Sequence, residues 1–307
     1  MAAYEESTIL STTGNKLVKL IWRPDGTPKG VVQLTHGMAE HILRYDSLAQ
    51  ALNSAGFAVV GHNHLGHGKT AEIQGYFAKK GGWDALLADI HKVRIDTEKE
   101  YPGLPYFLLG HSMGSFLVRC YLFEHSQGLK GAVLSGTGAF SASEAGLGLL
   151  LSRVLILLGR GKHPSKLVDT LAFSANNKPF LPAQTPFDWL SRDKGQVKVY
   201  VDDPMCGFLF TAKGYHDLFT GLDRLTKAES LKAMNKDLSV LFLAGSRDSV
   251  GKNGAGMQRV ADAFRGAGLK DITVKLYPEA RHEVFNEVNR REVYDDLISW
   301  LVDKSGA

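Results

Sequence analysis

The chain has few cysteines, no run of basic residues and no uninterrupted apolar segment of membrane-spanning length. Its only cysteines are Cys120 and Cys206, too few for a disulfide framework, and this scarcity fits a reducing compartment. The 36 basic and 32 acidic residues leave a formal charge of +4, and both kinds are dispersed along the 307 residues. Nucleic acid is therefore not an expected partner, because proteins that bind it usually cluster their Lys and Arg.

The amino-terminal segment and the most apolar stretch indicate where the protein is expected to work. Residues 1–6 carry two glutamates and lack the basic start and apolar run of a secretory signal, so a cytoplasmic location is expected. Residues 147–158 are the most apolar stretch, and as a helix they would reach about 18 Å, short of the roughly 30 Å hydrocarbon core. This stretch is predicted not to cross a bilayer, although its composition suits peripheral contact with a membrane surface.

The remaining composition is that of a soluble globular protein, with 44% hydrophobic and 22% charged residues. Short β-branched runs alternate with longer helical patterns, and several runs are apolar on successive residues, as in strands covered on both faces. The runs lie at residues 7–12, 16–22, 31–34, 57–60, 106–109, 132–134, 238–243 and 272–277. Amphipathic stripes over residues 83–94, 113–121 and 293–301 predict helices. The fold class is therefore predicted to be α/β, a mostly parallel eight-stranded sheet with helices on both faces.

The alternation stops between residues 140 and 215, where a structureless loop of such length would be unusual. We interpret residues 140–215 as a helical lid inserted into a core formed by residues 1–139 and 216–307. Two interpretations of the apolar residues 147–158 stay open. They pack onto the core, or they form a lid face that guides an acyl chain and touches a membrane.

Residues 110–114 read Gly-His-Ser-Met-Gly, which matches the G-x-S-x-G pattern of a nucleophile. The match falls directly between a predicted apolar strand and a predicted amphipathic helix. In this position a sharp turn exposes the serine hydroxyl above the edge of the sheet. Ser112 is therefore the candidate nucleophile.

A serine hydroxyl needs a base, and the base needs a carboxylate that orients it. In α/β folds that carry a serine nucleophile on such a strand-to-helix turn, the chain order is Ser, then Asp or Glu, then His, each on a loop after a strand. Asp248 follows the predicted strand at 238–243, and His282 follows the one at 272–277 and is the only histidine after Asp248. These positions predict a Ser112–Asp248–His282 triad.

An acyl-transfer site also stabilises an oxyanion, normally with two backbone N–H groups. One donor is expected from Met113, the residue after the nucleophile. The other is expected in the loop after the third strand, where Gly37 permits close backbone approach and Met38 follows it.

Residues 36–45, 65–68, 110–114 and 281–283 read HGMAEHILRY, LGHG, GHSMG and RHE. With these motifs the chain resembles the monoacylglycerol lipase and lysophospholipase group of α/β-hydrolase serine hydrolases. The resemblance implies a serine esterase with a lid, which acts on single-chain lipid esters and needs no cofactor. It also implies that Glu40 and Arg44 line the end of the pocket that receives glycerol.

Three other functions fit parts of the sequence. His62, His64 and His67 have the spacing of a metal cluster, although the aspartate that usually precedes the last histidine is replaced by Gly66. A hydrolase-fold sensor that binds a small apolar ligand with little turnover would keep the same triad. A peptidase on this fold would need an acidic cluster for a free amino terminus, and no such cluster is evident. We expect no bound metal.

Overall fold

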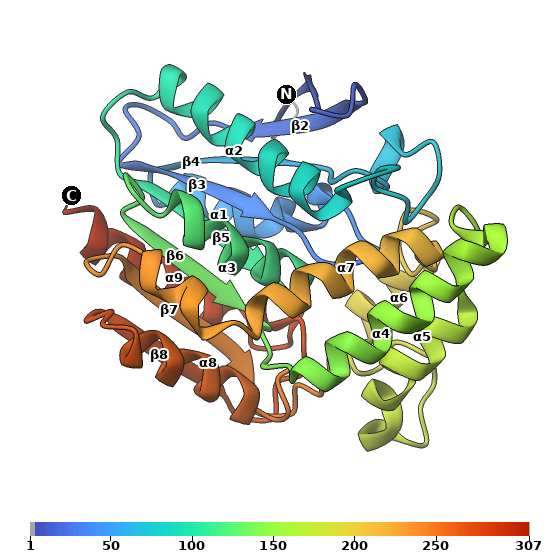
Figure 1. Ribbon diagram of the computed structural model, residues 1–307. Coiled ribbons are helices and arrows are strands. Elements are labelled where there is room, and N and C mark those ends of the chain that lie inside the picture. Colours follow the sequence, from blue (N-terminus) through green and yellow to red (C-terminus); the bar gives the residue numbers. More distant parts are fainter. Residues whose placement is uncertain (1–3, 307) are drawn as a thin grey trace.

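The computed structural model describes residues 4–306 and is built on one eight-stranded sheet with the strand order β1-β2-β4-β3-β5-β6-β7-β8 (Figure 1). The β1–β2 and β2–β4 pairs are antiparallel, and all other neighbouring pairs are parallel. The strands are β1 (Glu5–Leu10), β2 (Lys16–Trp22), β3 (Gly30–Thr35), β4 (Phe57–His62), β5 (Tyr106–His111), β6 (Gly131–Ser135), β7 (Ser239–Gly245) and β8 (Ile272–Tyr277). Each lies where the sequence predicts a strand, and the α/β fold class is confirmed.

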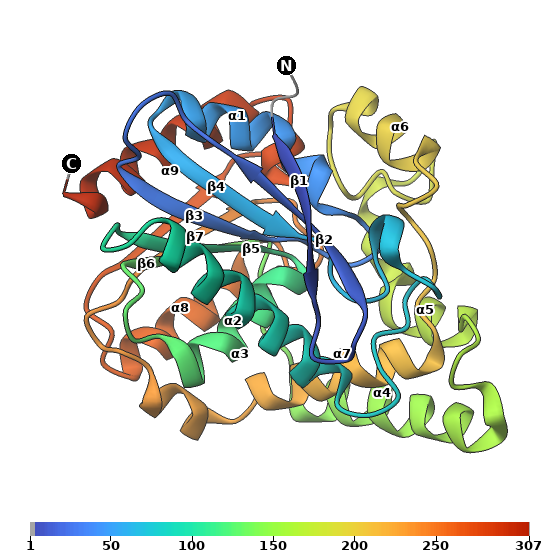
Figure 2. The ribbon, with the colours of Figure 1, turned by 90° about the horizontal axis from the view of Figure 1, so that it is seen from above.

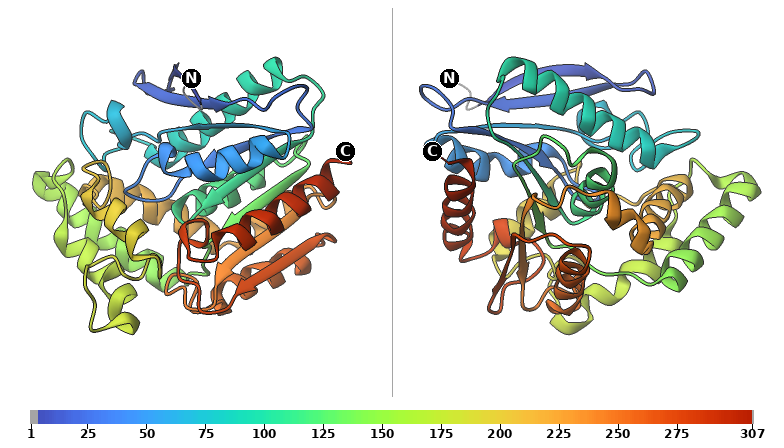
Figure 3. Two further views of the ribbon diagram at one scale, coloured as in Figure 1. Left: turned by 180° about the vertical axis from the view of Figure 1, so that it is seen from behind. Right: turned by 60° about the vertical axis from the view of Figure 1, so that its left-hand side comes forward.

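Helices cover both faces of the sheet, as the continuous burial of its central strands requires (Figures 2 and 3). On one face lie α1 (Asp46–Ser54) and α9 (Arg290–Ser305), which share an apolar core with the sheet residues Val32 and Leu109. The other face is covered by α2 (Gly82–Glu100), α3 (Met113–His125) and α8 (Ala255–Gly266). The carboxyl ends of β3, β5, β6, β7 and β8 meet at one edge, where the predicted site residues follow them.

The segment between β6 and β7 is helical, and most of it lies beyond that edge of the sheet (Figure 1). It contains α4 (Ala142–Leu155), η3 (Ile156–Arg160), α5 (Lys166–Phe173), η4 (Ser174–Phe180), α6 (Lys194–Asp202) and α7 (Ala212–Leu225). The other short helices are η1 (Ile42–Tyr45), η2 (Gly68–Thr70), η5 (Ala228–Ala233) and η6 (Val284–Asn286). The predicted lid boundary at residues 215/216 falls inside α7, which packs on both α4 and α3. We call residues 140–211 the cap.

The leucine-rich cap helix is longer than the sequence pattern indicates. Because α4 continues into η3, residues Ala142–Arg160 form a helical segment of 19 residues, within which an 18-residue window has a mean hydropathy of 1.6 and is 17% buried. The expectation from a 12-residue helix, that this stretch is too short to cross a bilayer, is therefore corrected. A single helix of 19 residues is long enough to cross a membrane, but its length and composition are only weak support for a span. A left-handed residue, Gly159 with φ 79°, interrupts the segment.

The face that α4 turns to the protein consists of small residues. Ala145, Gly148 and Ser152 are buried, and a Cβ on Gly148 would lie 2.5 Å from the Phe219 ring of α7. Leu149, Leu151 and Leu155 are partly buried against the core, whereas four other leucines of the α4–η3 segment are exposed. Their exposed fractions are 67% for Leu147, 62% for Leu150, 77% for Leu157 and 69% for Leu158. These leucines do not pack onto the core.

Candidate active site

Ser112 lies in the turn between β5 and α3 in a backbone conformation that few residues adopt. Its φ of 53° and ψ of −121° lie outside the backbone regions that are sterically favoured for a residue with a Cβ. Its amide donates a 2.9 Å hydrogen bond to the Ser135 carbonyl at the end of β6, which holds the turn against the sheet. The side chain is part-exposed, whereas its neighbours His111 and Met113 are buried. The strained turn thus presents the hydroxyl at the edge of the sheet.

The two glycines of the pentapeptide are required by close packing. A Cβ on Gly110 would collide with the backbone of Gly114, and a Cβ on Gly114 would collide with the Thr35 carbonyl of β3. The first turn of α3 therefore lies directly on β3. Its free N–H groups and positive dipole end face the site.

Asp248 and His282 form a buried pair on the loops after β7 and β8. His282 Nδ1 lies 2.9 Å from Asp248 Oδ1, and the exposed fractions are 1% for His282 and 0% for Asp248. Burial lowers the pKa of the imidazole, but the charge and hydrogen bond of Asp248 outweigh it, so the pKa of His282 is raised above 6.5. His282 Nε2 is buried and has no hydrogen-bond partner among residues 4–306.

Ser112 and His282 flank the same short segment after β6. A Cβ on Gly136 would lie 2.9 Å from the His282 ring, and the preceding Ser135 carbonyl accepts the Ser112 amide. In the part of the chain that the structure describes, no hydrogen bond joins the Ser112 hydroxyl to His282 Nε2. In the absence of substrate such bonds are often long. The structure therefore brings the three predicted residues to one edge of the sheet, and their catalytic roles remain a proposal.

The loop after β3 is held so that one amide stays available. The Gly37 amide donates to Glu40 Oε1 at 2.5 Å, and the Ala39 amide donates to His67 Nε2 at 3.2 Å. Between them, the Met38 amide has no acceptor among the described residues. A Cβ on Gly37 would lie 3.2 Å from the Ser112 Cβ, so the loop passes beside the nucleophile. This arrangement supports Met38 as an oxyanion donor beside the first helical amide, that of Met113.

Glu40 and Arg44 take part in a buried ionic network. Arg44 donates to Glu40 Oε2 at 2.5 Å and makes two 2.7 Å hydrogen bonds to Glu283, while Tyr45 donates to Glu40 Oε1 at 2.8 Å. Despite burial, Arg44 lowers the pKa of Glu283 to about 2. The network joins the Met38 loop to the residue beside His282. Contact of Glu40 and Arg44 with a substrate stays a prediction, because their charged atoms already have protein partners.

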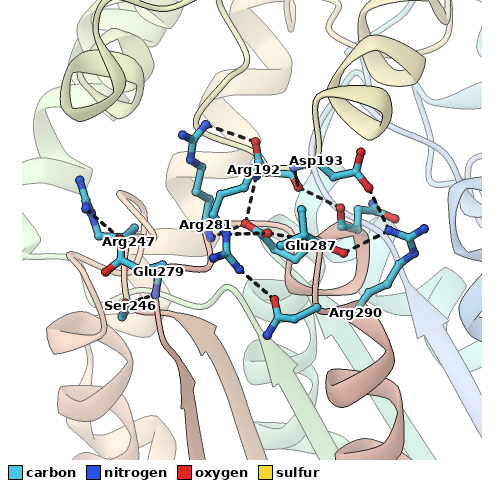
Figure 4. A network of polar contacts seen from close by, with 12 residues as sticks. Arg192, Asp193, Ser246, Arg247, Glu279, Arg281, Glu287 and Arg290 are labelled. Carbon is cyan, nitrogen blue, oxygen red and sulfur yellow. Dashed lines mark hydrogen bonds and ion pairs between the residues drawn. The ribbon is translucent and has the colours of Figure 1, made fainter.

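The cap is fastened to the loop that carries His282 (Figure 4). The amides of His282 and Glu283 donate to the carbonyls of Trp189 and Leu190 at 3.4 and 2.8 Å, and the Trp189 ring centroid lies 5.0 Å from that of His282. Next to them, the fully buried Glu287 accepts hydrogen bonds from Arg192 and from the Arg281 amide. Sequence reasoning missed Trp189 and Glu287, because no pattern within a short window marks a contact across about 95 residues.

The three histidines of the metal hypothesis do not gather around a common point. His67 uses both ring nitrogens, accepting from Ala39 and donating to the Leu65 carbonyl, and His64 contacts the backbone carbonyl of His36. Within residues 4–306, His62, His64 and His67 do not form a group close enough to hold one ion. They are instead neutral core residues, because burial lowers the pKa of His62 and of His67 to about 4.

These buried histidines predict a loss of stability in mild acid. The unfolded chain takes up protons near pH 6.5, whereas folded His62 and His67 resist protonation until about pH 4, so between these values the unfolded state binds more protons. The free energy of unfolding should fall by about 3 kcal/mol for each across this window. Urea denaturation at about pH 7.5 and about pH 4.5 measures the loss, and a His62→Phe variant should lose about 3 kcal/mol less. An equal loss in both proteins would contradict the prediction.

Comparisons with known proteins agree with the fold and the motifs. Residues 26–289 match the family described as serine aminopeptidase, S33. A monoacylglycerol lipase of Mycolicibacterium smegmatis is 30% identical over 305 residues, which cover 97% of this chain and 96% of that protein. A human monoglyceride lipase is 28% identical, with 97% and 90% covered. A crystal structure of a thermostable carboxyl esterase from Bacillus coagulans in complex with glycerol superposes with a TM-score of 0.92 at 30% identity, covering 99% of this chain and 100% of that one.

The predicted resemblance is thereby confirmed, and so is the prediction of a carboxylic-ester hydrolase. The family match covers well over half of the chain, and the bacterial relative is matched nearly from end to end. The chain therefore belongs to the serine aminopeptidase S33 family of α/β-hydrolases, within its monoacylglycerol lipase group.

Proposed function

We propose that the protein hydrolyses single-chain lipid esters, a monoacylglycerol or a lysophospholipid, through a Ser112–His282–Asp248 triad and an acyl-enzyme intermediate. The observation that carries this proposal is the buried Asp248–His282 pair, in which His282 Nε2 has no partner among the described residues. The His282 ring and the Ser112 amide both lie against the same short segment, Ser135 and Gly136. The relatives named monoacylglycerol lipase and monoglyceride lipase support the substrate class.

The mechanism follows from the positions of these groups. His282 Nε2 takes the proton from Ser112 as its oxygen attacks the ester carbonyl, and Asp248 stabilises the imidazolium through Nδ1. The Met38 and Met113 amides hold the oxyanion, and each such donor contributes about 3–4 kcal/mol to lowering the barrier. His282 then protonates the leaving alcohol. Water, deprotonated by the same imidazole, releases the fatty acid.

We further propose that the cap touches a lipid surface from which the substrate is drawn. The exposed leucines of α4 and η3 continue onto α5 and beyond, where Leu167, Leu171 and Leu181 are 54%, 68% and 67% exposed. Exposed apolar side chains in such number on neighbouring elements usually mark an interaction surface. The cap is also hydrogen-bonded to the His282 loop, so a lipid bound there would lie near the triad.

Replacing Leu150, Leu157 and Leu158 together by Ser should weaken binding to phospholipid vesicles. Each leucine side chain buried in lipid contributes about 1.5–3 kcal/mol to the binding free energy, so its replacement should lower the affinity about tenfold or more. Co-sedimentation with vesicles measures the loss. Hydrolysis of a soluble short-chain ester should change little, because these side chains are exposed and belong to none of the proposed catalytic groups.

The matched control replaces three large apolar residues outside the cap. Leu10, Leu276 and Val288 are 57%, 46% and 58% exposed. Their triple Ser variant should bind vesicles like the unaltered protein. Equal weakening in the two triple variants would show that the cap has no special role.

One set of substrates tests the proposed function. Monoacylglycerols, lysophospholipids and p-nitrophenyl esters of graded chain length are compared by kcat/KM, with aminoacyl p-nitroanilides added for the peptidase alternative. A preference for medium or long single-chain esters, unaffected by a strong chelator, supports the proposal. Labelling of Ser112 by a fluorophosphonate without repeated turnover would instead support a sensor.

A further inference from the structure

We propose that His41, Asp203 and Cys206 form a binding site for one zinc-type divalent cation at the junction of the cap and the Met38 loop. His41 follows Glu40 in the loop after β3, whereas Asp203 and Cys206 lie in the turn after α6. Imidazole, carboxylate and thiolate are the three kinds of side chain that bind Zn²⁺ in proteins. The triad chemistry needs no metal, so this site is separate from the proposed ester hydrolysis.

The ligand atoms are close to the separation that zinc requires. His41 Nε2 lies 2.8 Å from Asp203 Oδ2. One imidazole nitrogen of His41, one carboxylate oxygen of Asp203 and Cys206 Sγ all lie within 4.8 Å of one another. A tetrahedral Zn²⁺ with bonds of roughly 2.0–2.3 Å holds its ligands roughly 3.3–3.8 Å apart. Shifts of about 1 Å, within rotamer adjustment, would complete three of the four positions, and water would take the fourth.

Hydrogen bonds already orient the ligands. The Met205 amide donates to Asp203 Oδ1 at 2.8 Å, which leaves Oδ2 directed at His41. The Gly207 amide and the Tyr200 hydroxyl donate to the Ala39 carbonyl at 2.9 and 3.0 Å and so tie the two segments together. Partners of this kind around the ligands fix metal sites and raise their affinity.

The surrounding charges suit a cation once all of them are counted. Arg44 is close to Cys206, but its positive charge is shared between the carboxylates of Glu40 and Glu283. Together with Asp203 these four groups carry a net negative charge. Zn²⁺ would displace the thiol proton of Cys206, which passes to solvent, and would bind Nε2 of the neutral His41 ring, whose one N–H proton would then lie on Nδ1. The Asp203 side chain is 23% exposed, which leaves a route for entry.

Metal at this position would fix the cap turn to the loop that carries Met38. Zinc should therefore lower ester turnover, a consequence that rests on the proposed function, whereas metal binding itself does not. The binding measurement consequently stands even if the assignment of the triad fails.

The test uses metal-free full-length protein and Cd²⁺ as the probe, because a cadmium–thiolate bond has a charge-transfer absorption in the ultraviolet. We expect one equivalent of Cd²⁺ to produce this band. The Cys206→Ala variant should lose it, and a Cys120→Ala variant should keep it, since Cys120 lies buried under α7. In calorimetry with Zn²⁺, Asp203→Asn and His41→Gln should each weaken binding by on the order of tenfold to a hundredfold.

Two results would overturn the site. One is stoichiometric cadmium binding without the thiolate band, which would locate the ion at histidines elsewhere. A second is a band that survives in Cys206→Ala. Zinc inhibition that persists unchanged in Cys206→Ala would overturn only the inhibitory consequence, because the inhibitory ion would then bind elsewhere. Thermal unfolding of each variant confirms that it is folded before titration.

Discussion

Ser112→Ala should reduce kcat for ester hydrolysis by about a million-fold while leaving the protein folded. Without the hydroxyl no acyl-enzyme forms, and the oxyanion donors and substrate binding retain only about 10³–10⁴ of acceleration over water. The Met38 and Met113 amides are backbone groups and remain in place. Steady-state hydrolysis of a p-nitrophenyl ester gives the loss, and reaction with a fluorophosphonate should disappear with it.

The control for this prediction is Ser299→Ala on the exposed side of α9. Its hydroxyl bonds only to a carbonyl of its own helix, Asp295, so turnover and labelling should match the unaltered protein. If Ser112→Ala retained a tenth of the activity, another nucleophile would have to be sought.

The sequence was sufficient for the sheet and for the residues that gather at its edge. Runs that are apolar on successive residues identify the buried parallel strands, and each candidate catalytic residue follows one of them, as Ser112 follows β5 and His282 follows β8. In a parallel sheet the carboxyl ends meet at one edge. Residues 170 positions apart thus become neighbours through topology alone.

The orientation of the cap helix could not be read in this way. Leucines on several faces of a helix indicate that its apolar surface is covered, but the pattern does not distinguish the protein core from a lipid or another partner. The structure resolves this point through Gly148, whose lack of a side chain lets α4 approach Phe219. The small residues pack there, and the exposed leucines of the segment are Leu147, Leu150, Leu157 and Leu158. The Arg44–Glu283 pair was equally hidden, because its partners are 239 residues apart.

Asp248→Asn should lower kcat by about ten-thousandfold, the second largest effect that we expect. An asparagine in this place favours the wrong imidazole tautomer and no longer stabilises the imidazolium. Only the neutral imidazole acts as a base, so kcat/KM rises with pH through the pKa of His282. That pKa is raised above 6.5 in the unaltered protein, and the acidic limb should have its midpoint above this value. Without the Asp248 charge, the midpoint should move to lower pH.

Glu283→Gln is the comparison that decides which carboxylate orients His282. Glu283 is adjacent to the histidine in the chain, but its oxygens bond to Arg44 and Asn286, whereas Asp248 bonds to Nδ1. Removing its charge should cost about 3 kcal/mol of stability, because a buried ion pair is broken while Glu40 still accompanies Arg44. Most of the turnover should remain in the folded protein. Asp248→Asn should therefore lose turnover, whereas Glu283→Gln should lose stability. If Glu283→Gln lost the turnover and Asp248→Asn kept it, the orienting role would belong to Glu283.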